Sequence, residues 1–145
     1  PGAPRDTPEE VRGRAEIEAF LKVLQPAIET ARRTYPQARD RFLRGLPPQH
    51  SFFVVIRLPA EQKGVEQVFL AVDRIDKGII YGRIWSDILR ARPYKKGDRY
   101  SVPEDQIVDW LITRPDGSEE GNFVGKAIDK LQTERAQGLG RQKRE

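Results

Sequence analysis

The sequence predicts an α+β domain, in which N-terminal helical segments and a C-terminal helix pack on a curved antiparallel sheet of four to five strands. Three observations lead to this fold class. Apolar residues recur with a helical period before residue 45, with a strand period over 51–114, and with a helical period again over 122–135. Because helices and strands are segregated along the chain instead of alternating, the pattern is typical of α+β proteins.

The predicted helical arm, residues 7–45, opens on a capping box. Thr7 is a good N-cap, Pro8 suits the first helical position, and Glu10 follows three residues after the cap. The sequence therefore predicts that a helix begins at residue 8.

The apolar face of this arm has a heptad spacing. Its members are Ile17, Leu21, Leu24, Ile28, Ala31, Tyr35, Ala38 and Phe42. Pro26 and Pro36 interrupt the face, and each removes an intrahelical hydrogen bond at a cost of about 3 kcal/mol. We therefore expect two or three helical segments, at about 8–24, 27–35 and 37–44. A dimeric coiled coil is the alternative reading of the same spacing.

The middle of the chain predicts a meander of antiparallel strands. The segment 52–59, FFVVIRLP, is almost wholly apolar and predicts a central strand. The other predicted strands are 65–75, 78–85, 98–102 and 107–114. The last is followed by the turn PDGS and then by the amphipathic helix 122–135, whose first residues could instead continue the sheet.

Length and composition predict a single domain over residues 7–135, with a flexible leader, 1–6, and a disordered basic tail, 136–145. The net charge of +4 is concentrated at the ends, because residues 51–121 carry 11 basic and 12 acidic side chains. The neutral centre argues against a general nucleic-acid-binding surface. No stretch of the sequence is long and apolar enough to predict membrane insertion.

Several short motifs carry a family resemblance. They are Gly97-Asp98, Val102-Pro103, Ile107, Asp109-Trp110 and Gly121-x-Phe123, together with Gly82 and the helix that contains Tyr35-Pro36. In this order, over residues 28–131, the chain resembles the small bacterial YegJ-like domain family, which has no known function. The chain departs from that family's pattern at Gln67, where the family commonly has a histidine.

The resemblance implies a compact α+β domain and no particular reaction. Some similar proteins are exported, which implies a cleaved N-terminus, and the chain begins PGAPRDTPEE and contains no methionine. We therefore expect an exported, periplasmic location in preference to a cytoplasmic one.

The residues available for catalysis are few. The chain has no cysteine and one histidine, His50. Because His50 lies in a Pro-rich connector, we expect it to be a surface or capping residue. Neither a metal-ligand spacing nor a glycine-rich nucleotide loop occurs in the sequence. We therefore expect no metal and no cofactor, and the sequence leans away from an enzyme.

Carboxylates offer the remaining route to catalysis. Asp98 and Asp109 flank one strand-turn-strand unit, with Glu104 and Asp105 between them, so an acid/base pair of a hydrolase is conceivable. The structural alternative places Asp98 in a tight turn and Glu104-Asp105 in a single helical turn after Pro103. Asp109 is harder to explain this way, because acids are disfavoured in the middle of a strand.

Trp110 shares its face of the strand with Val108 and Ile112. We expect this face to be the core, in which case Asp109 points to solvent with Leu111. In the alternative, Trp110 lines an open groove with its indole N–H available as a donor.

A basic cluster precedes the fourth predicted strand. Five cations and two tyrosines occur within ten or so residues: Arg90, Arg92, Tyr94, Lys95, Lys96, Arg99 and Tyr100. Such a cluster could bind phosphate or single-stranded nucleic acid, or it could be a solvated loop that protects a sheet edge.

These observations predict a small bacterial binding or interaction domain without enzymatic activity, whose partner is an unknown protein or small ligand. The candidate binding residues are Asp109, Trp110, Arg90, Arg92, Tyr94, Lys95, Lys96 and Arg99. The alternatives are nucleic-acid or anionic-polymer binding through the 90–99 loop, and a carboxylate-dependent hydrolase. We expect a monomer, with a dimer through the helical arm as the alternative.

Overall fold

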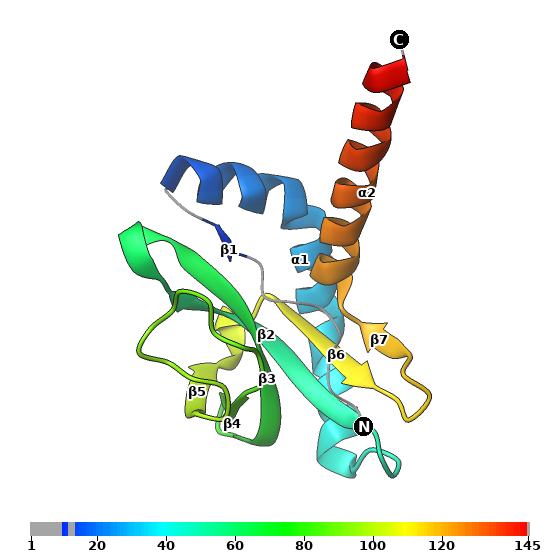
Figure 1. Cartoon of the computed structure of the whole chain (residues 1–145). Coiled ribbons are helices and arrows are strands. Elements are labelled where there is room, and N and C mark those ends of the chain that lie inside the picture. The colour runs from blue at the N-terminus through cyan, green and yellow to red at the C-terminus, as the bar shows by residue number, and fades with distance from the viewer. Residues whose placement is uncertain (1–9, 12–13, 145) are drawn as a thin grey trace.

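The structure is a computed structural model, and it describes residues 10–11 and 14–144. Two helices pack on an antiparallel sheet (Figure 1). The strands are β1 (Glu10–Val11), β2 (Ser51–Pro59), β3 (Val65–Asp76), β4 (Ile79–Ile84), β5 (Arg99–Pro103), β6 (Asp109–Thr113) and β7 (Glu119–Gly121); the helices are α1 (Arg14–Arg44) and α2 (Phe123–Arg144), and single 3-10 turns lie at Glu61–Lys63 and Glu104–Gln106. The α+β class is therefore confirmed.

The sheet has the strand order β5-β4-β3-β2-β6-β7, with β1 paired to β3 off this path. The expectation of four to five strands was too low: six strands follow one another in this order. The two strands missed, β1 and β7, span only two and three residues, which is too short to show a strand period. All described pairings are antiparallel.

The five longer strands lie where the sequence predicted them. Strand β2 is central, because β3 pairs along one of its edges and β6 along the other. Its side chains from Phe52 to Ile56 are all buried, so both faces of the strand are covered. An almost wholly apolar segment is expected for such a position.

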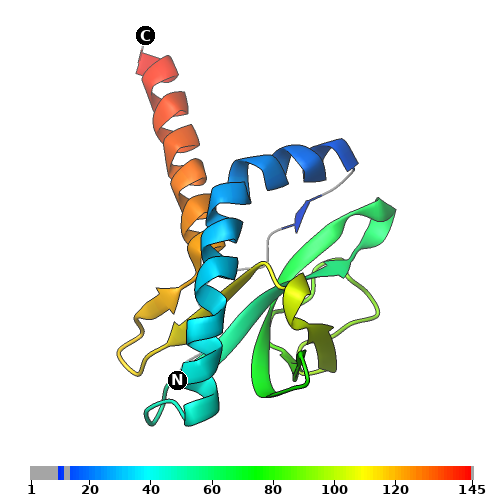
Figure 2. The ribbon, with the colours of Figure 1, turned by 180° about the vertical axis from the view of Figure 1, so that it is seen from behind.

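Helix α1 is one helix, where two or three segments were expected. Pro26 and Pro36 both lie inside it, and the helix bends between its first and second halves (Figure 2). A proline bends a helix and removes one hydrogen bond without ending it when tertiary packing holds both sides. The packing is present here, since Leu24, Ile28 and Tyr35 are at most 5% exposed.

The predicted helix start was also wrong where it can be examined. Thr7 and Pro8 lie outside the described residues, as does the predicted leader 1–6. Glu10–Val11 forms β1, so the residue proposed to close the capping box belongs to a strand, and α1 begins at Arg14.

Helix α2 continues through Arg144, so residues 136–144 are helical where a disordered tail was expected. Its outer part projects away from the sheet (Figures 1 and 2). The alternative that the first residues of this helix continue the sheet was wrong, because α2 begins at Phe123 and the short strand β7 ends just before it at Gly121. Gly121 makes the turn into the helix at φ +84°, where a Cβ atom would lie 2.5 Å from the backbone oxygen of Trp110.

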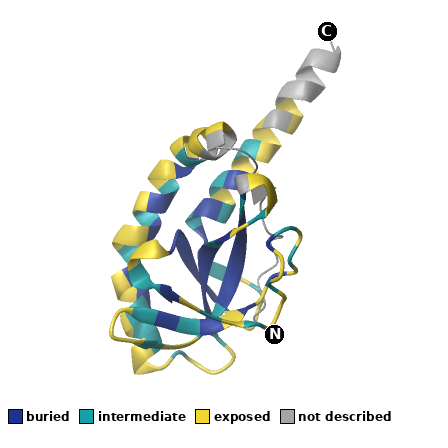
Figure 3. Ribbon diagram, turned by 90° about the vertical axis from the view of Figure 1, so that its left-hand side faces the viewer, coloured by how far each residue is buried: buried dark blue, intermediate teal, exposed yellow. Residues whose placement is uncertain are grey.

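The main core lies between α1 and the sheet. Ala31, Tyr35 and Ala38 of α1 pack with even-numbered residues of β2, including Val54 and Ile56. A second cluster joins the two helices through Leu24, Ile28, Val124 and Ile128. Figure 3 shows the buried centre of the sheet and the exposed outer surface of α1. The heptad face of α1 is thus covered within the chain over residues 24–38, where a coiled-coil dimer would have needed it exposed.

Within the described part of the chain, neither helix has an apolar stretch sufficient to cross a lipid bilayer.

Candidate ligand-binding site

Trp110 lies in the core, as expected, and does not line an open groove. Its side chain is 2% exposed and packs edge-on against Phe123, with ring centroids 5.9 Å apart. The indole N–H donates a hydrogen bond to Thr34 Oγ1 at 2.9 Å, so its polar atom is satisfied inside the protein. This geometry gives Trp110 a structural role.

Asp109 is fully buried, and the expectation that it points to solvent was wrong. Its Oδ1 accepts the backbone N–H of Trp110 at 2.8 Å, and its Oδ2 accepts that of Val124 at 2.7 Å. Val124 lies in the first turn of α2, so the carboxylate sits at the N-terminus of this helix, where backbone N–H groups lack helical partners. Burial raises the pKa of Asp109 to about 7, although these N–H groups act in the opposite direction.

The two aspartates proposed as an acid/base pair do not meet. Asp98 Oδ2 accepts the backbone N–H of Lys95 at 2.9 Å, in the turn before β5. Strands β4, β3 and β2 lie between β5 and β6, so at the usual spacing of neighbouring strands β5 and β6 are roughly 19 Å apart across the sheet. Glu104 lies in the expected helical turn, where its carboxylate accepts hydrogen bonds from Tyr35 and Arg39.

The loop that carries the basic cluster, residues 85–98, is held by a buried acid that sequence reasoning missed. Glu66 in β3 is fully buried, and its carboxylate accepts the backbone N–H groups of Leu89, Arg90 and Ala91, each at 2.8 Å. Ser86 adds a second tether, because its Oγ accepts the N–H of Phe69 at 2.8 Å. The signal available in the sequence was an acid within a strand that is otherwise largely apolar.

Part of the predicted basic cluster converges on one pocket, which we call the basic pocket. Its volume is about 500 Å³, and it is lined by Asp87, Ile88, Arg92, Pro93, Tyr94, Lys95 and Lys96. Tyr94 is partly buried and packs edge-on against Tyr100, with ring centroids 5.7 Å apart. Four of the predicted binding residues thus come together in this pocket.

The remaining cations of the cluster lie elsewhere. Arg90 does not line the basic pocket, and its backbone N–H is committed to Glu66. Arg99 lines a different hollow of about 390 Å³ over β3, β4 and β5, together with Arg74, Tyr81 and Arg83. Asp109 and Trp110 are buried at β6 and line neither hollow.

A second pocket, which we call the apolar pocket, lies at the corner between α1 and β2. It has a volume of about 450 Å³ and is lined by Phe42, Gly45, Leu46, His50, Ser51, Phe52, Phe53, Ala71, Val72 and Trp85. Trp85 is 40% exposed and lies 6.4 Å, centroid to centroid, from the ring of Phe53. Trp85 was not predicted as a site residue, because in the sequence it only ends the predicted strand 78–85.

His50 is only partly buried, and its Nδ1 lies 3.1 Å from the backbone oxygen of Pro48. This local contact agrees with the structural reading of the residue. Among the residues that the structure describes, no three His, Cys, Asp or Glu side chains gather in a way that could hold a metal ion.

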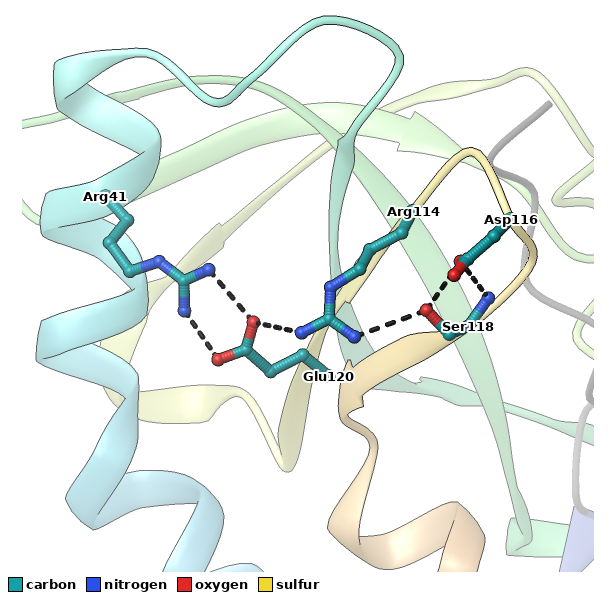
Figure 4. Close-up of polar contacts among 5 residues, drawn as sticks. All are labelled: Arg41, Arg114, Asp116, Ser118 and Glu120. Carbon is teal, nitrogen blue, oxygen red and sulfur yellow. Dashed lines mark hydrogen bonds and ion pairs between the residues drawn. The ribbon is translucent and has the colours of Figure 1, made fainter.

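Another group of cations is fully engaged in ion pairs. Glu120 of β7 accepts a bidentate interaction from Arg41 of α1, at 2.6 and 2.9 Å, and a further hydrogen bond from Arg114 at 3.0 Å (Figure 4). The turn before β7 is completed by Ser118, which donates to Asp116. We call these five residues the paired corner. The network fastens the β6–β7 hairpin to α1.

Among the residues that the structure describes, two buried side-chain atoms have no hydrogen-bond partner. They are Arg57 Nη2 and Gln67 Oε1, which belong to directly opposed residues of β2 and β3. Burial and the charge of Arg32 lower the pKa of Arg57. Neither residue lines the three pockets described above, so we assign this pair no role.

Comparison with curated proteins and with solved structures found no match. A family model described as "Uncharacterized protein conserved in bacteria (DUF2314)" matches residues 22–139, which include most of both helices and all five longer strands. This match agrees with the predicted bacterial family of unknown function, although it does not single out YegJ-like proteins. The chain therefore belongs to the DUF2314 family of uncharacterised bacterial proteins.

Proposed function

We propose that this chain is a non-enzymatic binding domain that takes an anionic ligand in the basic pocket. The observation that carries the proposal is the convergence of Arg92, Lys95 and Lys96 on one concave site beside Tyr94. Concave sites with a few convergent polar groups are the usual places of ligand binding.

The charge of the pocket supports an anionic ligand. Arg92 and Lys95 form no ion pair with a carboxylate of the described residues, and both side chains are exposed. Asp87 is the one acid in the lining. The pocket therefore has an excess of positive charge that a ligand carboxylate or phosphate would neutralise.

The loop 85–98, which lines the basic pocket, is held in place by buried or partly buried hydrogen bonds. Glu66 and Ser86 fix the loop backbone at several points before any ligand arrives. A loop that is already ordered loses less conformational entropy on binding, which favours affinity.

Single-stranded nucleic acid is the second candidate. It is favoured by the hollow next to β5, where Arg74 stacks 3.8 Å from the ring centroid of Tyr81 and Arg99 lies nearby. Single-stranded nucleic acid binds such surfaces because its bases stack on aromatic rings and the cations neutralise its phosphates. The carboxylate-dependent hydrolase is not carried forward, because Asp98 and Asp109 are separated and bound to backbone N–H groups.

The test is a titration of the protein with oligoglutamate and with oligothymidylate, followed by NMR of backbone amides. We expect oligoglutamate to shift the amides of residues 87–96, with affinity that falls as salt rises from about 50 to about 200 mM. The double variant Lys95→Gln/Lys96→Gln should bind about five- to tenfold more weakly.

The matched control is Lys22→Gln/Lys130→Gln, which removes the same charge from exposed positions on the two helices. It should change the affinity less than twofold. Equal weakening by both double variants, or no amide shift with oligoglutamate, would refute the basic pocket as the site. Shifts that oligothymidylate produces around Arg74, Tyr81 and Arg99 would favour the second candidate.

The exported location, the monomeric state and the narrower relation to YegJ-like proteins stay predictions. Anionic ligands occur in the periplasm and in the cytoplasm, so the proposed binding does not depend on the location of the protein.

A further inference from the structure

We infer that the apolar pocket and the basic pocket are two parts of one recognition site, whose ligand is a peptide segment with an acidic side chain next to a large apolar one. This inference rests on the proposed function and deepens it, because it names the class of ligand. Trp85 and Lys96 are the residues that connect the two pockets.

The connection is a direct contact. Lys96 lines the basic pocket, and its Nζ lies 5.6 Å from the ring centroid of Trp85, which lines the apolar pocket. The ammonium group of Lys96 is therefore placed above an exposed aromatic surface. A ligand acid that bound Lys96 would bring its neighbouring groups against the Trp85 ring.

The apolar pocket has the composition of an anchor site. Phe42, Leu46 and Phe53 line it together with Trp85, which is unusually exposed for a tryptophan. Exposed aromatic groups at the edge of a pocket are typical of binding surfaces, and aromatic anchors dominate binding energy there. The volume of about 450 Å³ accommodates a leucine or phenylalanine side chain.

Charge complementarity selects the rest of the ligand. The basic pocket, with its cations Arg92, Lys95 and Lys96, requires an acid, whereas the apolar lining requires an uncharged side chain. Successive side chains of an extended peptide are about 3.3 Å apart along the chain and point to opposite sides. A short acidic peptide can thus present one group to each pocket without folding.

The experiment is selection from a library of short random peptides displayed on phage, with the whole immobilised chain as bait. We expect enrichment of sequences in which Asp or Glu lies within three positions of Phe, Leu, Trp or Ile. The same selection on Trp85→Ala should lose the apolar preference, and on Lys95→Gln/Lys96→Gln it should lose the acidic preference.

Direct binding then measures each contribution. One enriched peptide is compared with a copy whose apolar anchor is replaced by Gly and with a copy whose acids are replaced by amides. Trp85→Ala should weaken the parent peptide about thirtyfold and the anchorless copy less than twofold. Trp85→Phe keeps an aromatic surface and should retain most of the affinity for the parent peptide that Trp85→Ala loses. Binding by this variant would show that the weakening in Trp85→Ala does not come from a folding defect.

The outcomes separate the inference from the proposed function. Enrichment of acids alone would leave the basic pocket in place and overturn the apolar subsite. Enrichment of apolar residues alone, with no effect of Lys95→Gln/Lys96→Gln, would overturn both. Absence of any enriched motif, or binding only of small amphipathic anions added as competitors, would overturn the peptide as the ligand.

Discussion

The paired corner and the loop 85–98 both carry clustered cations, yet the two regions use them differently. At the paired corner, Arg41 and Arg114 converge on Glu120, and the network joins α1 to the β6–β7 hairpin. In the loop, the backbone is held by buried Glu66, while Arg92 and Lys95 make no ion pair with the described carboxylates. The comparison shows that cation density alone does not distinguish a structural cluster from a candidate binding site. The position of the partner acids does.

The largest expected effect tests how the loop is held. Glu66→Ala removes the acceptor of three buried or partly buried backbone N–H groups, so we expect the free energy of unfolding to fall by about 4 kcal/mol. Urea denaturation measures the fall, and hydrogen exchange should show faster exchange at 89–91. Glu61→Ala, at an exposed position, is the control. Unchanged exchange at 89–91 would mean that the loop does not depend on Glu66.

The next effect concerns Asp109, the buried acid of β6, the strand that pairs with the Glu120 strand β7. The pKa of Asp109 is raised to about 7, so the folded protein holds this proton more tightly than the unfolded chain. The buried carboxylate is disfavoured in its charged form, so the protein becomes less stable as pH rises from the ordinary pKa of 3.8 toward the pKa of about 7 in the folded state. Between pH 5 and pH 8 we expect the free energy of unfolding to fall by about 3 kcal/mol for this reason.

The comparison of wild type with Asp109→Asn isolates this effect, because other groups titrate equally in both proteins. The difference in free energy of unfolding between the two should change with pH, in favour of the variant at high pH. Asp105→Asn, at an exposed position, serves as the control and should show a constant difference. Parallel pH profiles of wild type and Asp109→Asn would contradict the raised pKa.

A smaller effect is expected from breaking the paired corner. Glu120→Gln removes the charge that joins Arg41 and Arg114, and we expect a loss of about 1 kcal/mol, since the group is partly exposed. These arginines hold the pKa of Glu120 below its usual range, so the stabilisation should be present at neutral pH and decline as pH falls through the pKa of the folded state. Thermal unfolding of both proteins at pH 7 and pH 3 checks the size and the direction.

The smallest effect completes the contrast between the two regions. Lys95→Gln/Lys96→Gln should change the free energy of unfolding by less than about 0.5 kcal/mol, because both side chains are exposed and the contact of Lys96 with the Trp85 ring lies at the surface. Denaturant unfolding beside Glu120→Gln measures this on one scale. A loss as large as that of Glu120→Gln would show that the loop cations are structural and would weaken the proposed binding site.

The sequence determined the elements whose signal is local. The period of the apolar residues predicted the α+β class and the five longer strands, and the alternation around Trp110 predicted its burial. These features depend on neighbouring residues, since one face of a strand or helix is encoded by spacing within that element. The basic cluster was likewise visible as a run of residues in the sequence.

The tertiary structure decided everything that joins distant positions. Helix α1 continues past Pro26 and Pro36 because the sheet and α2 hold its apolar face, and local propensity does not include that packing. Asp109 reaches the start of α2 across a turn, and Glu66 binds a loop more than twenty residues away. The same is true of the contact between Lys96 and Trp85, because a buried acid fixes the loop that brings them together. The physical reason is that hydrogen bonding and packing depend on which segments meet in space, whereas periodicity reports only which face of each segment is apolar.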